Sequence, residues 1–216
     1  MTLYKATREN GHSFTGSVDY SPGLTGETIL HPSPKSRSTD AKDYLSVSVE
    51  PGDCTGFSWP ARLFEVKAVG RAWTPHKSEL PNKRAVRGVT VVRELPAYAL
   101  FGPQGEAIVT IIDTFAGLSR AQRDRLYAAR SAGWSSAWNV AYDGRAGRAG
   151  LRAAQGALYG RLRGWLDDYA AYGAALAVLL RHTIGKDGFT QEHYNALTAP
   201  WVTVTGKRAH PEDAVL

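Results

Sequence analysis

Residues 44–49 read Tyr-Leu-Ser-Val-Ser-Val and lead directly into Glu50 and the pair Pro51-Gly52. Apolar and small polar side chains alternate there with period two, which is typical of a strand that buries one face. Proline followed by glycine is a common turn signal. The stretch therefore predicts a β-strand that ends in a turn.

Other segments of the first half carry the same kind of pattern. Residues 3–7, 63–69 and 86–95 are rich in β-branched and aromatic side chains, and glycine or proline closes the last two. Residues 107–112 (AIVTII) fit either a fifth strand or the opening of a helical region. We expect a β-rich domain over residues 1–113, built on a small, mainly antiparallel, twisted sheet.

Residues 114–186 favour helix. Seventeen of these 73 residues are alanine, and no proline occurs between Pro103 and Pro200. Ser119 is a suitable N-cap for a first helix. Tyr127, Trp134, Trp138 and Tyr142 have a helical spacing, which places them on one face of a helix. We expect the part of this face formed by Trp134, Trp138 and Tyr142 to be mostly buried against the rest of the protein. A break is expected where Asp143 is followed by a glycine cluster at Gly144, Gly147 and Gly150.

Residues 187–216 are expected to return to the first domain. Thr190 is a good N-cap for a short helix that Pro200 would stop. Residues 201–205 alternate before Gly206, which predicts a strand. The overall expectation is an α+β protein with a helical appendage rich in alanine, tryptophan and arginine.

Composition limits the classes of protein that the chain can belong to. Its 216 residues are 43% hydrophobic and 21% charged, which is ordinary globular usage. The single cysteine, Cys54, excludes an intrachain disulfide and a cysteine-cluster zinc site. The apolar stretch 169–180 is too short to span a membrane. We expect a cytoplasmic protein with no membrane partner; the oligomeric state stays open.

The sequence offers no familiar metal or nucleotide motif. It contains no P-loop, no dinucleotide-binding glycine fingerprint and no HExxH pair. The six histidines are not spaced as metal ligands, so no metal site is predicted.

Positive charge is concentrated in one third of the chain. The net charge is +6, and residues 114–186 alone carry eleven basic and four acidic residues. Such a segment fits a nucleic acid or an acidic protein surface as partner, or else an arginine-rich face that only meets water. The candidate contact residues are Arg145, Arg148, Arg152, Arg161 and Arg163.

The order of five segments resembles the small NAD-dependent ADP-ribosyltransferases of the rifampicin-modifying type. The segments are LYKAT at 3–7, YLSVS at 44–48, LFEV at 63–66 leading to Gly70, PNK at 81–83 and GVTVV at 88–92. The resemblance covers residues 3–95. The whole chain also resembles proteins of actinobacteria and their phages that begin with LYKATR and carry a Trp/Ala/Arg-rich helical region.

The first resemblance implies NAD as the cofactor and assigns roles to particular residues. Lys5 falls where the family has its NAD-binding histidine, and Tyr44 falls on the tyrosine that stacks on nicotinamide. Asn82, or Glu79 with a small shift, falls on the catalytic acid. Thr7 and Ser46 lie on the same two segments and are candidate cofactor-binding residues. Because cleavage of NAD passes through an oxocarbenium-like state, a carboxylate is needed nearby to stabilise its charge.

Three functions follow from these observations. The first is a non-catalytic binding protein on a degenerate ADP-ribosyltransferase-like scaffold, an accessory factor that contacts nucleic acid or a protein partner through the basic helical region. The second is an active enzyme that moves ADP-ribose from NAD to an acceptor. The third is a virion-associated structural protein whose aromatic helices form a subunit interface.

Overall fold

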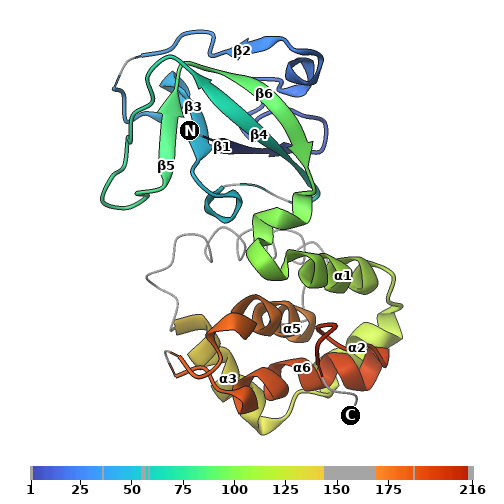
Figure 1. Cartoon of the computed structure of the whole chain (residues 1–216). Coiled ribbons are helices and arrows are strands. Elements are labelled where there is room, and N and C mark those ends of the chain that lie inside the picture. Colours follow the sequence, from blue (N-terminus) through green and yellow to red (C-terminus); the bar gives the residue numbers. More distant parts are fainter. Residues whose placement is uncertain are drawn as a thin grey trace. The chain divides into compact units, whose positions relative to one another are not determined.

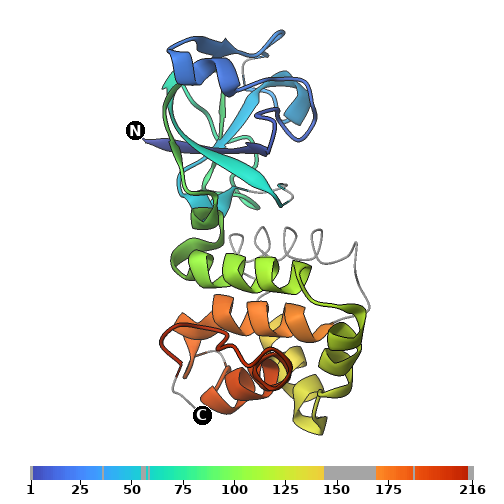
Figure 2. The same cartoon turned by 90° about the vertical axis from the view of Figure 1, so that its right-hand side faces the viewer.

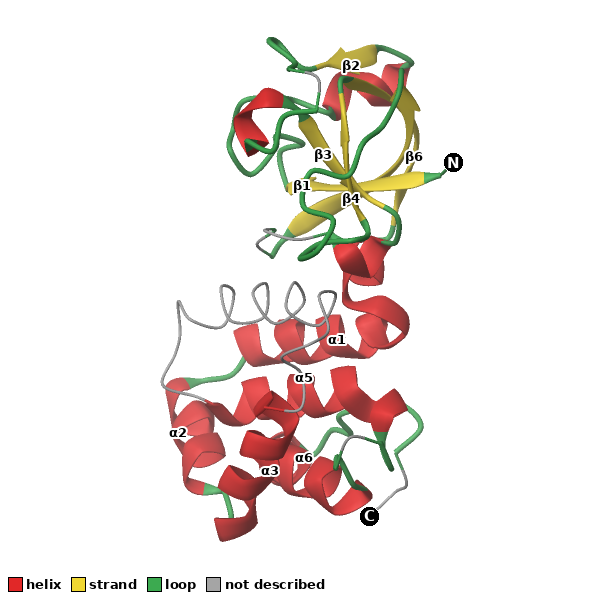
Figure 3. Cartoon of the chain, turned by 90° about the vertical axis from the view of Figure 1, so that its left-hand side faces the viewer, coloured by secondary structure: helices red, strands yellow, loops and turns green. Residues whose placement is uncertain are grey.

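The chain forms two compact units that divide between Leu100 and Phe101. The computed structural model describes residues 2–35, 37–54, 57, 59–143, 169–186 and 188–213, except for the side chains of residues 132, 142, 143 and 169. Strands belong to the N-terminal unit and the long helices to the C-terminal unit (Figure 3). This confirms the α+β class. The division falls before the predicted boundary at 113, because residues 107–112 lie in a helix rather than a strand.

The N-terminal unit is built on one six-stranded antiparallel sheet (Figure 1). Its spatial order is β2 (Thr28–Leu30), β6 (Gly88–Leu95), β4 (Ala61–Val69), β1 (Leu3–Arg8), β3 (Leu45–Ser48) and β5 (Lys83–Val86). The predicted strands at 3–7, 44–49 and 63–69 are confirmed to within two residues at each end. The segment 86–95 contains a boundary instead: β5 ends at Val86 and β6 begins at Gly88.

Gly88 is required for the approach of β2. A Cβ atom there would lie 2.6 Å from a side-chain carbon of Leu30 and 2.9 Å from the carbonyl oxygen of Ile29. Any larger residue would push the edge strand β2 away from β6.

The core of this unit explains the position of Lys5. Leu45 and Val47 of β3 alternate into a cluster with Phe64 and Val66 of β4, as period-two patterning requires. Lys5 is directly paired with Phe64 across the β1–β4 ladder. Because paired residues share a face of the sheet, the Lys5 side chain starts from the row that faces the core.

Short 3-10 helices connect these elements: η1 (Ser21–Thr25), η2 (Ala41–Asp43), η3 (Pro51–Asp53), η4 (Ala97–Gln104) and η5 (Arg181–Thr183). The segment between β1 and η1 folds back on itself through a bridge between His12 and Asp19. Gly11 has a φ of +84°, and a Cβ there would meet the Ser21 hydroxyl, so glycine sets this turn.

The C-terminal unit is a helical bundle. Its described helices are α1 (Gly105–Ala116), α2 (Arg120–Ala128), α3 (Ala132–Asp143), α5 (Tyr169–Leu180) and α6 (Gln191–Thr205). Helix α5 is buried along its whole described length from residue 170 to 180. It packs between α1 and α6 (Figure 2). An apolar sequence on all sides is what such a central helix needs.

Two predicted caps are confirmed, and one predicted stop is wrong. Ser119 and Thr190 each form a capping box, with Gln122 and His193 respectively. Helix α6 continues through Pro200 to Thr205, so the strand expected at 201–205 does not form. Trp201 is 1% exposed there, and burial of this side chain outweighs the missing backbone donor of Pro200. Gly206, with a φ of +67°, ends the helix.

The segment from residue 188 to 213 also belongs to the helical unit rather than to the first domain. Helix α6 contacts α2, α3 and α5. The expectation that this segment would complete the sheet is therefore corrected.

The predicted aromatic face is partly confirmed. Trp134 is buried and stacks on the half-buried Trp138 with ring centroids 5.2 Å apart. A Cβ atom on Gly173 of α5 would lie 2.8 Å from the Trp134 ring, so the two helices are in close contact. Tyr127 is 53% exposed because it lies on α2, and the turn between α2 and α3 breaks the helical spacing. Tyr142 and the predicted glycine break lie outside the described side chains and residues.

Candidate ligand pocket

A cavity of about 500 Å³ opens in the N-terminal unit. It is lined by β1, β3, the start of β5 and the loops around residues 13–20, 31–33 and 41–44. Because β1, β3 and β5 are neighbours in the sheet (Figure 1), residues far apart in the sequence meet there. We call this cavity the Lys5 pocket.

Lys5 lies at the centre of the interactions in this pocket. Its half-buried ammonium donates a hydrogen bond to the backbone carbonyl oxygen of Ser46 at 3.0 Å. It also lies 5.1 Å from the centroid of the Tyr20 ring, a cation–π distance. Burial lowers the pKa of Lys5 to about 8, and the positive charge of Lys83 lowers it further while the nearby Cys54 opposes the shift.

The described lining of the pocket contains lysines but no carboxylates. Lys5, Lys42 and Lys83 line it, and no aspartate or glutamate does so among the described residues. Lys42 forms an ion pair with Asp40 at 2.8 Å at the edge of the pocket. Burial also lowers the pKa of Lys83. The positive charge of Lys83 disfavours the charged form of Lys5, and an anion bound near both ammonium groups would stabilise that charged form.

Two tyrosine hydroxyls of the lining are buried without a hydrogen-bond partner in the described parts of the chain. The hydroxyls of Tyr20 and Tyr44 make no hydrogen bond to any described residue. Both side chains line the pocket, and burial raises the pKa of both phenols. The Tyr44 ring is held edge-on against Trp73 with centroids 5.7 Å apart. Because an unsatisfied buried hydroxyl costs about 1–3 kcal/mol, a polar ligand would find partners here.

The remaining polar lining consists mainly of donors. The Nδ1 atom of His31 accepts a hydrogen bond from the Ser33 backbone N–H at 3.1 Å, which assigns the proton of the neutral ring to Nε2. Ser13, Thr15 and Ser17 form a hydroxyl cluster, with 3.0 Å between the first pair and 2.8 Å between the second. Hydroxyls, an imidazole N–H and ammonium groups together suit phosphate or carboxylate oxygens.

Cys54 also lines the pocket but is not activated. It is buried, and burial raises the pKa of its thiol to about 11. The thiol is therefore protonated at neutral pH, as a small core side chain would be.

The sequence-predicted site residues are only partly brought together. Lys5, Tyr44 and Ser46 share the pocket, whereas Thr7 is buried elsewhere and donates to the carbonyl of Arg8. The two candidates for the catalytic acid do not line it: Glu79 is exposed, and the amide of Asn82 donates to Asp53 at 2.8 Å. The five candidate arginines, from Arg145 to Arg163, lie outside the described residues.

Several residues of the pocket, among them Tyr20, His31 and Lys83, were not among the predicted cofactor-binding residues. Tyr20 and His31 lie in two different loops. Lys83 is the first residue of the four-residue strand β5. Lys83 faces Ser48 across the β3–β5 ladder. Lys83 reaches the same pocket as Lys5 only through the spatial order of strands β1, β3 and β5, which a local sequence pattern does not reveal.

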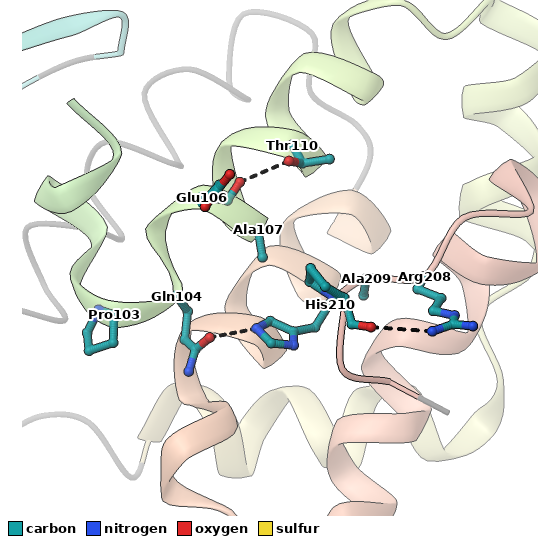
Figure 4. Close-up of a pocket in the computed structure, with 9 residues that line it drawn as sticks. Pro103, Gln104, Glu106, Ala107, Thr110, Arg208, Ala209 and His210 are labelled. Carbon is teal, nitrogen blue, oxygen red and sulfur yellow. Dashed lines mark hydrogen bonds between the residues drawn. The ribbon is translucent and has the colours of Figure 1, made fainter. Parts of the chain in front are cut away.

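A second, smaller cavity of about 280 Å³ lies in the helical unit, between the start of α1 and the residues after α6 (Figure 4). The Nε2 atom of His210 is 2.7 Å from Oε1 of Gln104, and its Nδ1 accepts the backbone N–H of Glu212 at 3.2 Å. Burial, followed by the charge of Arg181, lowers the pKa of His210. The neutral ring therefore joins the C-terminal segment to α1 with both nitrogens occupied.

Comparison of the chain with protein-family models, with curated proteins and with solved structures finds no match. Within the part of the chain that the structure describes, no helix is long and apolar enough to cross a membrane. The same residues contain no group of three histidine, cysteine or acidic side chains arranged to hold a metal ion.

Proposed function

We propose that this chain is a non-catalytic binding protein whose N-terminal unit takes an anionic, nucleotide-type ligand in the Lys5 pocket. The observation that carries the proposal is the pair Lys5 and Lys83, which line one pocket with no carboxylate among its described lining residues. The resemblance to NAD-dependent ADP-ribosyltransferases favours NAD or ADP-ribose as the nucleotide, since Lys5, Tyr44 and Ser46 are residues that it assigns to the cofactor.

The lining supports binding better than ADP-ribosyl transfer. An oxocarbenium-like state needs a nearby negative charge. Glu79 is exposed and does not line the pocket, and Asn82 carries no charge. A pocket of donors would hold a pyrophosphate but would not stabilise a developing cation on the ribose.

The pocket has room for part of a dinucleotide. Ligand cavities typically measure about 300–1,000 Å³, and this one measures about 500 Å³. The ring of Tyr44 is 3% exposed and already packs against Trp73. Tyr44 therefore offers its hydroxyl, rather than a free ring face, to a ligand.

The test is a calorimetric titration of the full chain with ADP-ribose, NAD, AMP and inorganic phosphate. We expect ADP-ribose to bind, and Lys83→Met to weaken binding by about tenfold or more, because a charge-assisted hydrogen bond is lost. The matched control is Lys67→Met, since Lys67 is exposed on β4 and does not line the pocket. No heat with any of the four ligands up to millimolar concentration would overturn the proposal.

A second measurement separates binding from catalysis. Incubation with NAD should release no nicotinamide and transfer no label to proteins of a lysate. Nicotinamide release that Glu79→Gln abolishes would instead support an active ADP-ribosyltransferase.

We further propose that the basic segment, with Arg145, Arg148, Arg152, Arg161 and Arg163, contacts nucleic acid or an acidic protein surface. The support is the excess of positive charge in residues 114–186. Binding to DNA or RNA through phosphates weakens steeply as salt rises. A salt-independent affinity for nucleic acid would exclude nucleic acid as the partner and leave an acidic protein surface.

The alternative of a virion-associated structural protein has a different test. A chain that assembles through its aromatic helices would elute above monomer size in size-exclusion chromatography.

A further inference from the structure

We propose that Lys5 is a covalent capture site, whose amine condenses with the carbonyl group of a ligand that also carries an anionic group. The inference rests on the proposed function for its anionic part and adds a second, chemical requirement on the ligand. It starts from the way in which Lys5 differs from the other lysines near the pocket.

Lys5 forms no ion pair with any residue that the structure describes. Lys35 lies 3.3 Å from Asp43, and Lys42 lies 2.8 Å from Asp40. Lys5 instead donates to the carbonyl of Ser46 and lies over the Tyr20 ring, with no carboxylate beside it among the described residues. A carbonyl oxygen and an aromatic face hold the nitrogen in place but compensate its charge only weakly.

Such surroundings favour the neutral amine, which is the nucleophilic form. With a pKa of about 8, roughly a quarter of Lys5 side chains are neutral at pH 7.5, against about one in a thousand for an ordinary lysine. A desolvated lysine next to a second cationic group is a common way to activate this nucleophile. Burial is the main cause of the lowered pKa of Lys5; Cys54 opposes the shift, and Lys83 adds a smaller lowering effect. Lys83 would also attract the anionic part of the ligand.

The chemistry balances without a further reactant. The neutral Lys5 nitrogen forms a bond to the carbonyl carbon as the π bond of the carbonyl group breaks, and one proton passes from nitrogen to oxygen to give a carbinolamine. Loss of that oxygen with two hydrogens, as water, leaves a carbon–nitrogen double bond. The reaction is reversible by water, so the captured ligand can be released.

The test uses pyridoxal 5′-phosphate, which combines an aldehyde with a phosphate, at limiting concentration on the full chain, followed by borohydride and peptide mapping. We expect one reduced adduct, on Lys5, formed about tenfold or more faster than on the exposed Lys67. Its rate should rise with pH, with a midpoint near pH 8. Lys5→Arg should lose the adduct, and Lys67→Arg should keep it. Pyridoxal, which lacks the phosphate, should label Lys5 more slowly by a similar factor.

Two outcomes would overturn the inference: labelling spread over the lysines in proportion to their exposure, or an unmodified Lys5. The same preparation is titrated with ADP-ribose. Nucleotide binding without the Lys5 adduct overturns covalent capture alone. The adduct without nucleotide binding supports capture and overturns the nucleotide ligand.

Discussion

The Lys5 pocket and the region around His210 both contain a titratable nitrogen and a tyrosine hydroxyl, but they differ in whether these groups have partners within the protein. In the helical unit, both nitrogens of His210 are bonded, and the Tyr194 hydroxyl donates to Asp213 at 2.8 Å. In the sheet unit, Lys5 has no carboxylate partner among the described residues, and the Tyr44 hydroxyl has no hydrogen-bond partner among them. Satisfied polar groups hold a fold together, whereas unsatisfied ones that line a pocket are available as partners for a ligand. The hydrogen bonds around His210 therefore serve the structure of the helical unit, whereas the Lys5 pocket is a candidate ligand site.

The largest expected effect is a loss of stability when Trp134 of the helical unit is truncated. Trp134→Ala removes a side chain that is 4% exposed and packs against Gly173, and it should lower the free energy of unfolding by about 3–5 kcal/mol. Chemical denaturation measures this. The control is Tyr127→Ala, at a residue 53% exposed, which should cost less than about 1 kcal/mol. A loss below about 1 kcal/mol for Trp134→Ala would mean that this face is not a core.

The next prediction tests the comparison directly with one substitution in each cavity. His210→Ala should lower stability by about 1–3 kcal/mol, because Gln104 and the Glu212 backbone N–H lose their partner. Lys5→Met should raise stability at pH 7 by about 1 kcal/mol, because a partly buried cation without a counter-ion is replaced by an apolar chain of similar length. Thermal unfolding of the wild-type protein and the two variants at the same pH measures both changes in stability. Opposite signs are required, and a destabilised Lys5→Met would show that Lys5 is a structural residue.

Removing the hydroxyl group of Tyr194 or of Tyr44 should change stability to different extents, with smaller effects than the substitutions of His210 and Lys5. Tyr194→Phe should cost about 1 kcal/mol, since the hydroxyl donates to Asp213. Tyr44→Phe should leave stability unchanged or slightly higher, because its hydroxyl has no partner among the described residues. The same Tyr44→Phe protein should bind ADP-ribose less tightly. Equal costs for the two deletions would erase the distinction between the cavities.

The smallest effect is a pH dependence. The pKa of Lys5 is about 8 in the folded chain and near its ordinary value when unfolded, so the unfolded chain binds more protons between about pH 8 and pH 10.5. This residue therefore makes stability rise with pH across that window. Affinity for an anion should fall as pH rises above about 8, because the charge of Lys5 is lost. Comparison of the wild-type protein with Lys5→Met isolates both slopes, and parallel curves would contradict the assignment.

Local signals in the sequence predicted most of the fold. Alternation gave the strands around Leu45 and Leu63, and hydroxyl caps at Ser119 and Thr190 gave the starts of two helices. The alternating segment 201–205 misled because burial of Trp201 decides its conformation, and burial is not a local property. Strand β2, with three residues, is too short to carry a period.

The site was less accessible to sequence reasoning than the fold. Lys5, Tyr44 and Ser46 were assigned together through a family resemblance, and they do share a pocket. Lys83 and Tyr20 join them through the strand order and a loop turn, neither of which leaves a spacing pattern.

The most direct test of the central claim is a titration of the wild-type protein and of Lys5→Met with ADP-ribose at pH 7 in two buffers of different ionisation enthalpy. We expect the wild-type protein to bind with an apparent heat that depends on the buffer, because Lys5 takes up a fraction of a proton as the anion binds. We also expect Lys5→Met to bind about tenfold or more weakly, with a smaller buffer dependence than the wild-type protein. Equal affinity and equal heats for the two proteins would contradict the claim that the Lys5 pocket is an anion-binding site.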